Sequence, residues 1–128
     1  MQLLLDTQVF LWWDSGDRLP RPGAFEAIAD PAGQVFVSAA SVLEIAIKAR
    51  LGKPGFTGSA VDAMGRNRFF ELPIVPAEAE AAGRIDWAHG DPFDRLLVAH
   101  ARLRGMTLVT ADRAIAGAGD TAQMWAGA

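Results

Sequence analysis

Hydrophobic and polar positions along the chain alternate between two kinds of segment. Short apolar runs rich in leucine, valine and phenylalanine predict buried strands, and the segments between them repeat apolar residues at helical spacing. The expected strands are residues 2–5, 34–38, 70–75 and 106–110, with a weak edge strand at 121–125. The expected helices are residues 9–13, 23–29, 41–52, 58–68, 77–85, 92–104 and 112–116, with a loop at 16–22. Strands that alternate with helices pair in parallel, so we expect a three-layer α/β/α sandwich with a parallel sheet of four or five strands.

Two of the expected helices have recognisable capping sequences at their start. Ser41-Val-Leu-Glu44 has the Ser-x-x-Glu form of a capping box and predicts that a helix opens there. In Asp91-Pro-Phe-Asp94, Asp91 is the expected N-cap, the proline takes the first helical position and Asp94 the third. Gly105 is the expected C-terminal stop of that second helix.

Four acidic residues lie where an apolar run ends or a predicted helix begins. Asp6 and Asp112 each follow a predicted strand, whereas Glu44 and Asp94 each open a predicted helix. In an alternating α/β fold, the C-terminal ends of strands and the N-terminal ends of helices share one edge of the sheet. The four carboxylates are therefore expected to converge, and clustered carboxylate oxygens favour Mg²⁺ or Mn²⁺.

Each of these acids also has a structural interpretation when it is taken alone. Asp6 and Asp112 would cap the helices that follow them, and Asp94 would be a favourable acid in a first helical turn. Glu44 would complete the capping box or pair with Lys48 four residues later. Four acids at matching topological positions are harder to explain in this way, so a metal site is the preferred interpretation.

The sequence also predicts the orientation of two of these acids and the roles of polar residues near them. Glu44 heads a helical stripe with Ile47 and Leu51, which predicts that its carboxylate points to the edge of the core, and Asp94 heads a similar stripe. Hydroxyl donors expected to orient the carboxylates are Thr7, Ser38 and Thr110. His89 is expected to be a solvated loop residue and His100 a structural residue in mid-helix.

Composition narrows the class of protein. The chain has 128 residues, of which 51% are hydrophobic, and this fits a single domain over residues 1–128. We expect a cytoplasmic protein without a membrane partner, because no long uncharged apolar stretch and no secretion signal are present. The absence of cysteine excludes disulfides and zinc–thiolate sites. A formal net charge of −3 is unusual for a nucleic-acid binder, but cations bound by clustered acids would reverse the local field.

The predicted chemistry is metal-assisted hydrolysis of a phosphodiester, in which divalent ions neutralise phosphate charge and activate water. Two alternatives stay open. Asp6 would be the nucleophile of a phosphoaspartate enzyme of the haloacid-dehalogenase kind, although Gln8 occupies the position where such enzymes carry a second aspartate. The second alternative is a non-catalytic binding module that retains the same fold.

At the level of whole motifs, the sequence resembles the PIN-domain nucleases, and among them the VapC-type toxins of type II toxin–antitoxin systems. The motifs are LLLDTQVFLW around Asp6, VSAASVLEIAIK around Glu44, DPFDRLLVAHA around Asp94 and LVTAD ending at Asp112. The resemblance implies a Mg²⁺- or Mn²⁺-dependent endoribonuclease with Asp6, Glu44, Asp94 and Asp112 as its acidic tetrad. It also implies an RNA substrate, a homodimer and inhibition by a cognate antitoxin. Ala111 departs from the family pattern, in which a basic residue often precedes the last acid.

Overall fold

Five strands form one all-parallel sheet in a computed structural model that describes residues 1–16 and 21–127. The strands are β1 (Gln2–Leu5), β2 (Gln34–Ser38), β3 (Phe70–Leu72), β4 (Thr107–Thr110) and β5 (Gln123–Trp125), and their order is β3-β2-β1-β4-β5. The helices are α1 (Thr7–Ser15), α2 (Pro22–Ala29), α3 (Ala39–Arg50), α4 (Ala60–Asn67), α5 (Pro76–Arg84), α6 (Pro92–Arg104) and α7 (Arg113–Ala116). The predicted class, an α/β/α sandwich with a parallel sheet, is confirmed.

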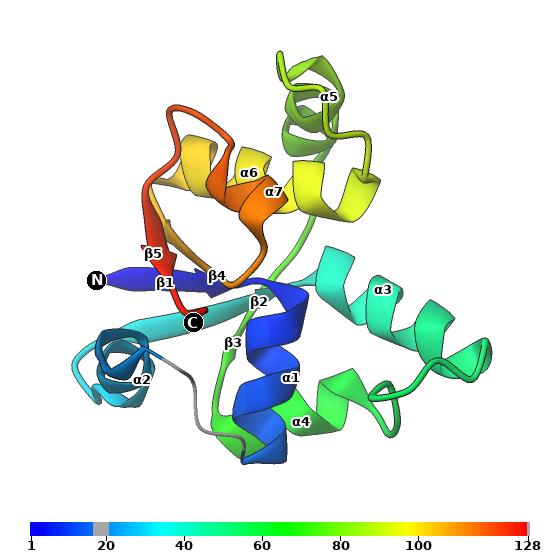
Figure 1. The fold of residues 1–128 in the computed structure, drawn as a ribbon, viewed down its shortest axis with the longest axis vertical. Helices are drawn as coiled ribbons and strands as arrows, with labels where there is room; N and C mark the ends of the chain where they lie inside the picture. The colour runs from blue at the N-terminus through cyan, green and yellow to red at the C-terminus, as the bar shows by residue number, and fades with distance from the viewer. Residues whose placement is uncertain (17–20, 128) are drawn as a thin grey trace.

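Helices cover both faces of the sheet, as Figure 1 shows, with α1, α2 and α4 on one side and α5, α6 and α7 on the other. Alternating residues of the central strand β1 supply the two cores. Leu3 and Leu5 pack in the core that includes Phe10 of α1, whereas Leu4 packs in the core that includes Leu97 of α6. Because both faces of β1 are buried, its sequence is a continuous run of leucines and not an alternation.

The start of α3 differs from the prediction. Ser38, the last residue of β2, is the N-cap, and its hydroxyl accepts a hydrogen bond from the amide of Ala40 at 3.0 Å. The helix therefore begins at Ala39, and the capping box predicted for Ser41 and Glu44 is wrong. The helix starts early because the last residue of the strand is itself the N-cap serine, so no loop separates β2 from α3.

The start of α6 follows the prediction. The Asp91 side chain accepts hydrogen bonds from the amides of Phe93 at 2.8 Å and Asp94 at 3.0 Å, which makes it the N-cap. Gly105 ends the helix with a φ of 65°, a left-handed conformation that glycine adopts without steric cost. This cap places Asp94 in the first turn of α6.

Other boundaries shift by a few residues. Strand β3 ends at Leu72 and not at residue 75, since Pro73 has no amide hydrogen to extend the ladder. The predicted loop at 16–22 lies partly outside the described residues; Gly16 caps α1 and Pro22 already belongs to α2. No helix in the described part of the chain is long and apolar enough to cross a membrane.

Candidate metal centre

Asp6 and Asp112 follow two strands that lie side by side in the sheet. Asp6 follows β1, Asp112 lies two residues beyond β4, and these strands pair in parallel. The amide of Asp6 donates to the carbonyl of Val109 at 2.9 Å, so the strand pairing continues up to the acid. The pKa of Asp6 is raised mainly by burial, and the negative charge of Asp112 adds to the rise. The expected convergence therefore holds for this pair.

The Asp6 carboxylate is buried and held by the protein. It is only 2% exposed, its Oδ1 accepts from the amide of Val9 at 2.7 Å, and its Oδ2 accepts from the Thr110 hydroxyl at 2.6 Å and the Ala111 amide at 3.2 Å. Burial raises the pKa of Asp6, because removal from water penalises the charged form more than these hydrogen bonds favour it. Thr110 thus orients an acid as predicted, while Asp6 also caps α1.

Glu44 lies in the second turn of α3 and is also buried, at 7% exposure. Its Oε1 accepts from the Thr7 hydroxyl at 2.6 Å, and its Oε2 accepts from the Lys48 ammonium at 2.8 Å. Because Thr7 directly follows Asp6, this bond connects the two acids through the start of α1. The stripe from which this burial was predicted does not face the core, however, because Ile47 and Leu51 are exposed at 42% and 66%.

Asp94 is half-buried in the first turn of α6, with its carboxylate facing His89. His89 Nε2 lies 2.6 Å from Asp94 Oδ2. The pKa of Asp94 is raised from 3.8 to about 6: burial is the main cause, the hydrogen bond from His89 opposes the rise, and the charges of Asp91 and Asp112 add to it. Asp94 and Asp112 therefore share one electrostatic field at this edge of the sheet.

The loop before α6 is built around one arginine. Arg95 donates to the carbonyl oxygens of Ala82, Ile85, Trp87 and His89 at 2.6 to 2.9 Å. The His89 ring also packs against the Trp87 ring, with centroids 4.8 Å apart. His89 is thus half-buried and held against Asp94, and the expectation of a solvated loop histidine is wrong.

The residues that could bind a metal ion are not all equally close to one another. His89, Asp91 and Asp94 offer ligand atoms that all lie within 4.8 Å of one another. Within residues 1–16 and 21–127, no three of the four predicted acids reach that spacing. Sequence reasoning treated Asp91 as a cap and missed His89 as a companion of Asp94; its position two residues before the N-cap was the available signal.

Open oxygen atoms remain at this edge. Asp112 is exposed and accepts from the amide of Ala114 through Oδ1 at 2.8 Å, as the N-cap of α7. In the described part of the chain, no hydrogen bond reaches Asp112 Oδ2 or Asp94 Oδ1. Carboxylate oxygens with open positions match the chemistry of a hard divalent cation.

A second polar network is buried away from these acids. Ser38 Oγ lies 2.8 Å from His100 Nε2, and His100 Nδ1 lies 2.6 Å from Glu78 Oε2. Arg104 donates to both oxygens of Glu78 at 2.8 Å. Burial lowers the pKa of His100, so the ring is neutral; with Nδ1–H donating to Glu78, Nε2 accepts from Ser38.

The serine–histidine–glutamate order of this network resembles that of a hydrolytic triad. Ser38 and His100 are 0% exposed, however, so no substrate reaches the hydroxyl. The network instead fastens the first turn of α3 and the helices α5 and α6 to one another. Ser38 was predicted to orient an acid and bonds His100 instead, while the structural role predicted for His100 agrees with its burial.

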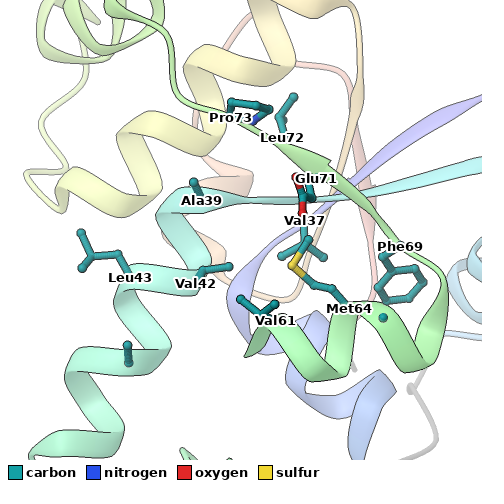
Figure 2. Close-up of a pocket in the computed structure, with 12 residues that line it drawn as sticks. Val37, Ala39, Val42, Leu43, Val61, Met64, Phe69, Glu71, Leu72 and Pro73 are labelled. Atoms are coloured by element: carbon teal, nitrogen blue, oxygen red, sulfur yellow. The ribbon is translucent and has the colours of Figure 1, made fainter. Parts of the chain in front are cut away.

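An apolar groove of about 760 Å³ lies between α3, α4 and β3. Figure 2 shows its lining side chains, with Val42 and Leu43 coming from α3, Val61 and Met64 from α4, and Leu72 from β3. Leu43 and Val61 are exposed at 53% and 61%. The groove thus lies along the helix that carries Glu44, on a surface rich in exposed apolar side chains.

The parallel sandwich and the acids at the carboxyl edge of its sheet define an α/β protein whose site suits divalent cations. Residues 3–120 match the family model described as PIN domain, and the chain therefore belongs to the PIN domain family, a family of nucleases. The resemblance expected from the motifs is confirmed at this level. Membership of this family leaves the haloacid-dehalogenase alternative without support. A comparison with curated proteins found no match.

Several solved structures share this fold at low sequence identity. VapBC2 from Rickettsia felis, bound to a DNA fragment from their promoter, matches with a TM-score of 0.70 and 12% identity over 98% of each chain. FitAcB from Neisseria gonorrhoeae matches with a TM-score of 0.61 and 19% identity, over 95% of this chain and 96% of that one. PAE2754 from Pyrobaculum aerophilum gives 0.60 and 16%, over 98% and 90%.

Proposed function

We propose that this PIN domain is a metal-dependent endoribonuclease that hydrolyses RNA phosphodiester bonds as the toxin of a type II toxin–antitoxin pair. The observation that carries the proposal is the shared field of Asp6, Asp94 and Asp112, in which burial and the negative charge of Asp112 raise the pKa values of both Asp6 and Asp94. Buried carboxylates whose pKa values are raised by burial and by a neighbouring acid are typical of catalytic sites and not of capping residues alone.

The proposed metal ligands and catalytic residues are Asp6, Glu44, Asp94 and Asp112. When bound, Mg²⁺ or Mn²⁺ would neutralise phosphate charge and lower the pKa of a bound water molecule. The protein's part is to hold the oxygens in place: Thr110 and the Ala111 amide fix Asp6, and Thr7 fixes Glu44. No hydrogen bond in the described residues reaches Asp94 Oδ1 or Asp112 Oδ2, and we propose that an RNA phosphate approaches the site at these oxygens.

The partners proposed with this function are an RNA substrate, a cognate antitoxin and a second copy of the chain, in the cytoplasm. The apolar groove between α3 and α4 supports an antitoxin partner, because its exposed Leu43 and Val61 suit an apolar segment of another protein. The two-component complexes VapBC2 and FitAcB share the fold. We propose that an antitoxin segment occupies this groove, next to the helix that carries Glu44.

The direct test is RNA cleavage by the purified protein and its Asp6→Asn variant. Asparagine retains an oxygen that caps α1, so the fold is expected to persist while one charge of the metal site is lost. We expect cleavage with Mg²⁺ or Mn²⁺, none in excess EDTA, and a loss of at least about 100-fold in the variant, an effect of the size seen when an electrostatic catalytic group is removed.

Asp62→Asn is the matched control, because Asp62 is an exposed acid in the first turn of α4. It should leave cleavage unchanged. Full activity of the Asp6→Asn variant, or of the wild type in EDTA, would contradict the proposal. If the wild type cleaves RNA and the Asp6→Asn variant does not, induced expression followed by mapping of RNA 5′ ends would identify the target.

A further inference from the structure

Lys48 occupies the oxygen of Glu44 that Thr7 leaves open. Its ammonium lies 2.8 Å from Oε2, while the Thr7 hydroxyl lies 2.6 Å from Oε1. Both oxygens of a proposed metal ligand are therefore bonded to donors of the same chain. Among the salt bridges of the described residues, the one that neutralises the Glu44 carboxylate is its pair with Lys48.

This pair is not an ordinary surface ion pair between neighbouring turns of a helix. An exposed pair of that kind contributes little, because water solvates both partners when they separate. The Glu44 side chain is only 9% exposed, so its charge needs a close partner. Lys48, in contrast, is 38% exposed and is free to move into water without a comparable cost.

The Lys48 side chain also has a second contact. Its ammonium lies 5.0 Å from the centre of the Phe56 ring, within the range of a cation–π interaction. The ring offers the ammonium a favourable contact that does not depend on Glu44. Leaving the carboxylate is therefore less costly for Lys48 than for a lysine with a single partner.

We propose that Lys48 is a tethered counter-ion of Glu44 that competes with the divalent cation for Oε2. This inference rests on the proposed function, and it assigns Lys48 a positioning role and no catalytic one. In the metal-free protein the ammonium keeps the buried carboxylate paired. Cation binding then requires Lys48 to withdraw, so Lys48 lowers the affinity of the site for metal.

The test is the Mn²⁺ affinity of purified protein, measured by titration calorimetry for the wild type and three variants. Lys48→Met keeps the apolar stem and removes the charge, Lys48→Arg keeps the charge, and Lys53→Met makes the same change in net charge at an exposed position nearby. We expect Lys48→Met to bind Mn²⁺ about 10-fold more tightly, since a positive charge next to the site is lost. Lys48→Arg and Lys53→Met should stay within about twofold of the wild type.

A second readout does not depend on metal affinity. In EDTA, Lys48→Met should unfold at a lower temperature than the wild type, because Glu44 loses its only ion-pair partner in the described structure. Saturating Mn²⁺ should remove most of that difference. If Lys48→Met does not fold, Lys48→Gln keeps a donor for Glu44 without the charge and takes its place.

Unchanged or weaker Mn²⁺ binding by the uncharged variant would overturn the inference, as would an equal gain in Lys53→Met. Either result leaves the nuclease proposal intact, because wild-type binding and cleavage are measured separately. A wild-type protein that binds no Mn²⁺ would instead overturn the proposed function, and the role of Lys48 with it.

Discussion

Replacing Glu78 by glutamine tests the buried network that fastens α5 and α6 to β2. Glu78 is 3% exposed, and its two oxygens accept two bonds from Arg104 and one from His100. Glutamine removes the charge and places an amide donor where one oxygen accepted. At least one of those donors then faces another donor in a buried position, which is costly.

The size of the effect follows from the pKa of Glu78. The hydrogen bond from Arg104 and, to a smaller extent, the one from His100 lower that pKa from 4.5 to about 2. At about 1.4 kcal/mol for each pH unit, this corresponds to about 3 kcal/mol of stabilisation at neutral pH. The Arg104 side chain is 36% exposed and partly screened by water, so we expect Glu78→Gln to cost about 2 kcal/mol at pH 7.

The pH dependence gives the sign. A carboxylate whose pKa is lower in the folded state stabilises the protein above its unfolded pKa and loses that contribution as the pH falls. The difference between wild type and variant should be full above pH 5 and about half near pH 3. Only a small part of the difference should remain near pH 2, which is about the pKa of Glu78 in the folded protein.

Urea unfolding at pH 7, 5 and 3 measures that difference. Glu80→Gln is the matched control, because Glu80 lies on the same helix and pairs with Arg84 in an exposed ion pair. It should change the free energy of unfolding by less than about 0.5 kcal/mol. A loss below that size for Glu78→Gln, or one that is the same at pH 7 and pH 3, would refute the reasoning.

Two further predictions concern the proposed site and the groove. Asp94→Asn should stabilise the protein in EDTA at pH 7 by about 1–3 kcal/mol by urea unfolding, because burial raises the Asp94 pKa from 3.8 to about 6 and ionisation then opposes folding. That gain should vanish below pH 4, and no gain at pH 7 would contradict it. Leu43→Glu should weaken antitoxin binding at least 10-fold by calorimetry, while the equally exposed Leu103→Glu on α6 should not.

The central strands were predictable because burial on both faces leaves a continuous apolar run in the sequence. Leu3, Leu4 and Leu5 show this in β1, and the bounds of β1 and β2 match the prediction. The start of α3 was not predictable from a capping pattern alone. Ser38 and Ser41 are both serines in an apolar context, and the sheet decides between them by ending at Ser38.

Topology also made part of the site predictable. Asp6 and Asp112 follow β1 and β4, and any parallel sheet that pairs these strands brings the two acids together. The partner of Asp94 was not predictable in this way, because the contact of His89 depends on the loop conformation that Arg95 holds. Similarly, His100 meets Ser38 from 62 residues away, a separation at which no local pattern gives a signal.

The acids of the proposed metal site and the buried network of Ser38, His100, Glu78 and Arg104 have opposite effects on folding. The two groups share helix α6. Burial raises the pKa of Asp94, so ionisation of this acid at neutral pH destabilises the metal-free fold. His100 and Arg104 lie on the same helix as Asp94, and through Glu78 and Ser38 they fasten α6 to α5 and to the start of α3. Glu44 lies on α3, so this network fixes the two helices that carry Glu44 and Asp94. The network around Glu78 stabilises the fold and includes none of the four proposed metal ligands. It therefore offsets the cost of keeping the charged oxygens of those ligands where a cation would bind them.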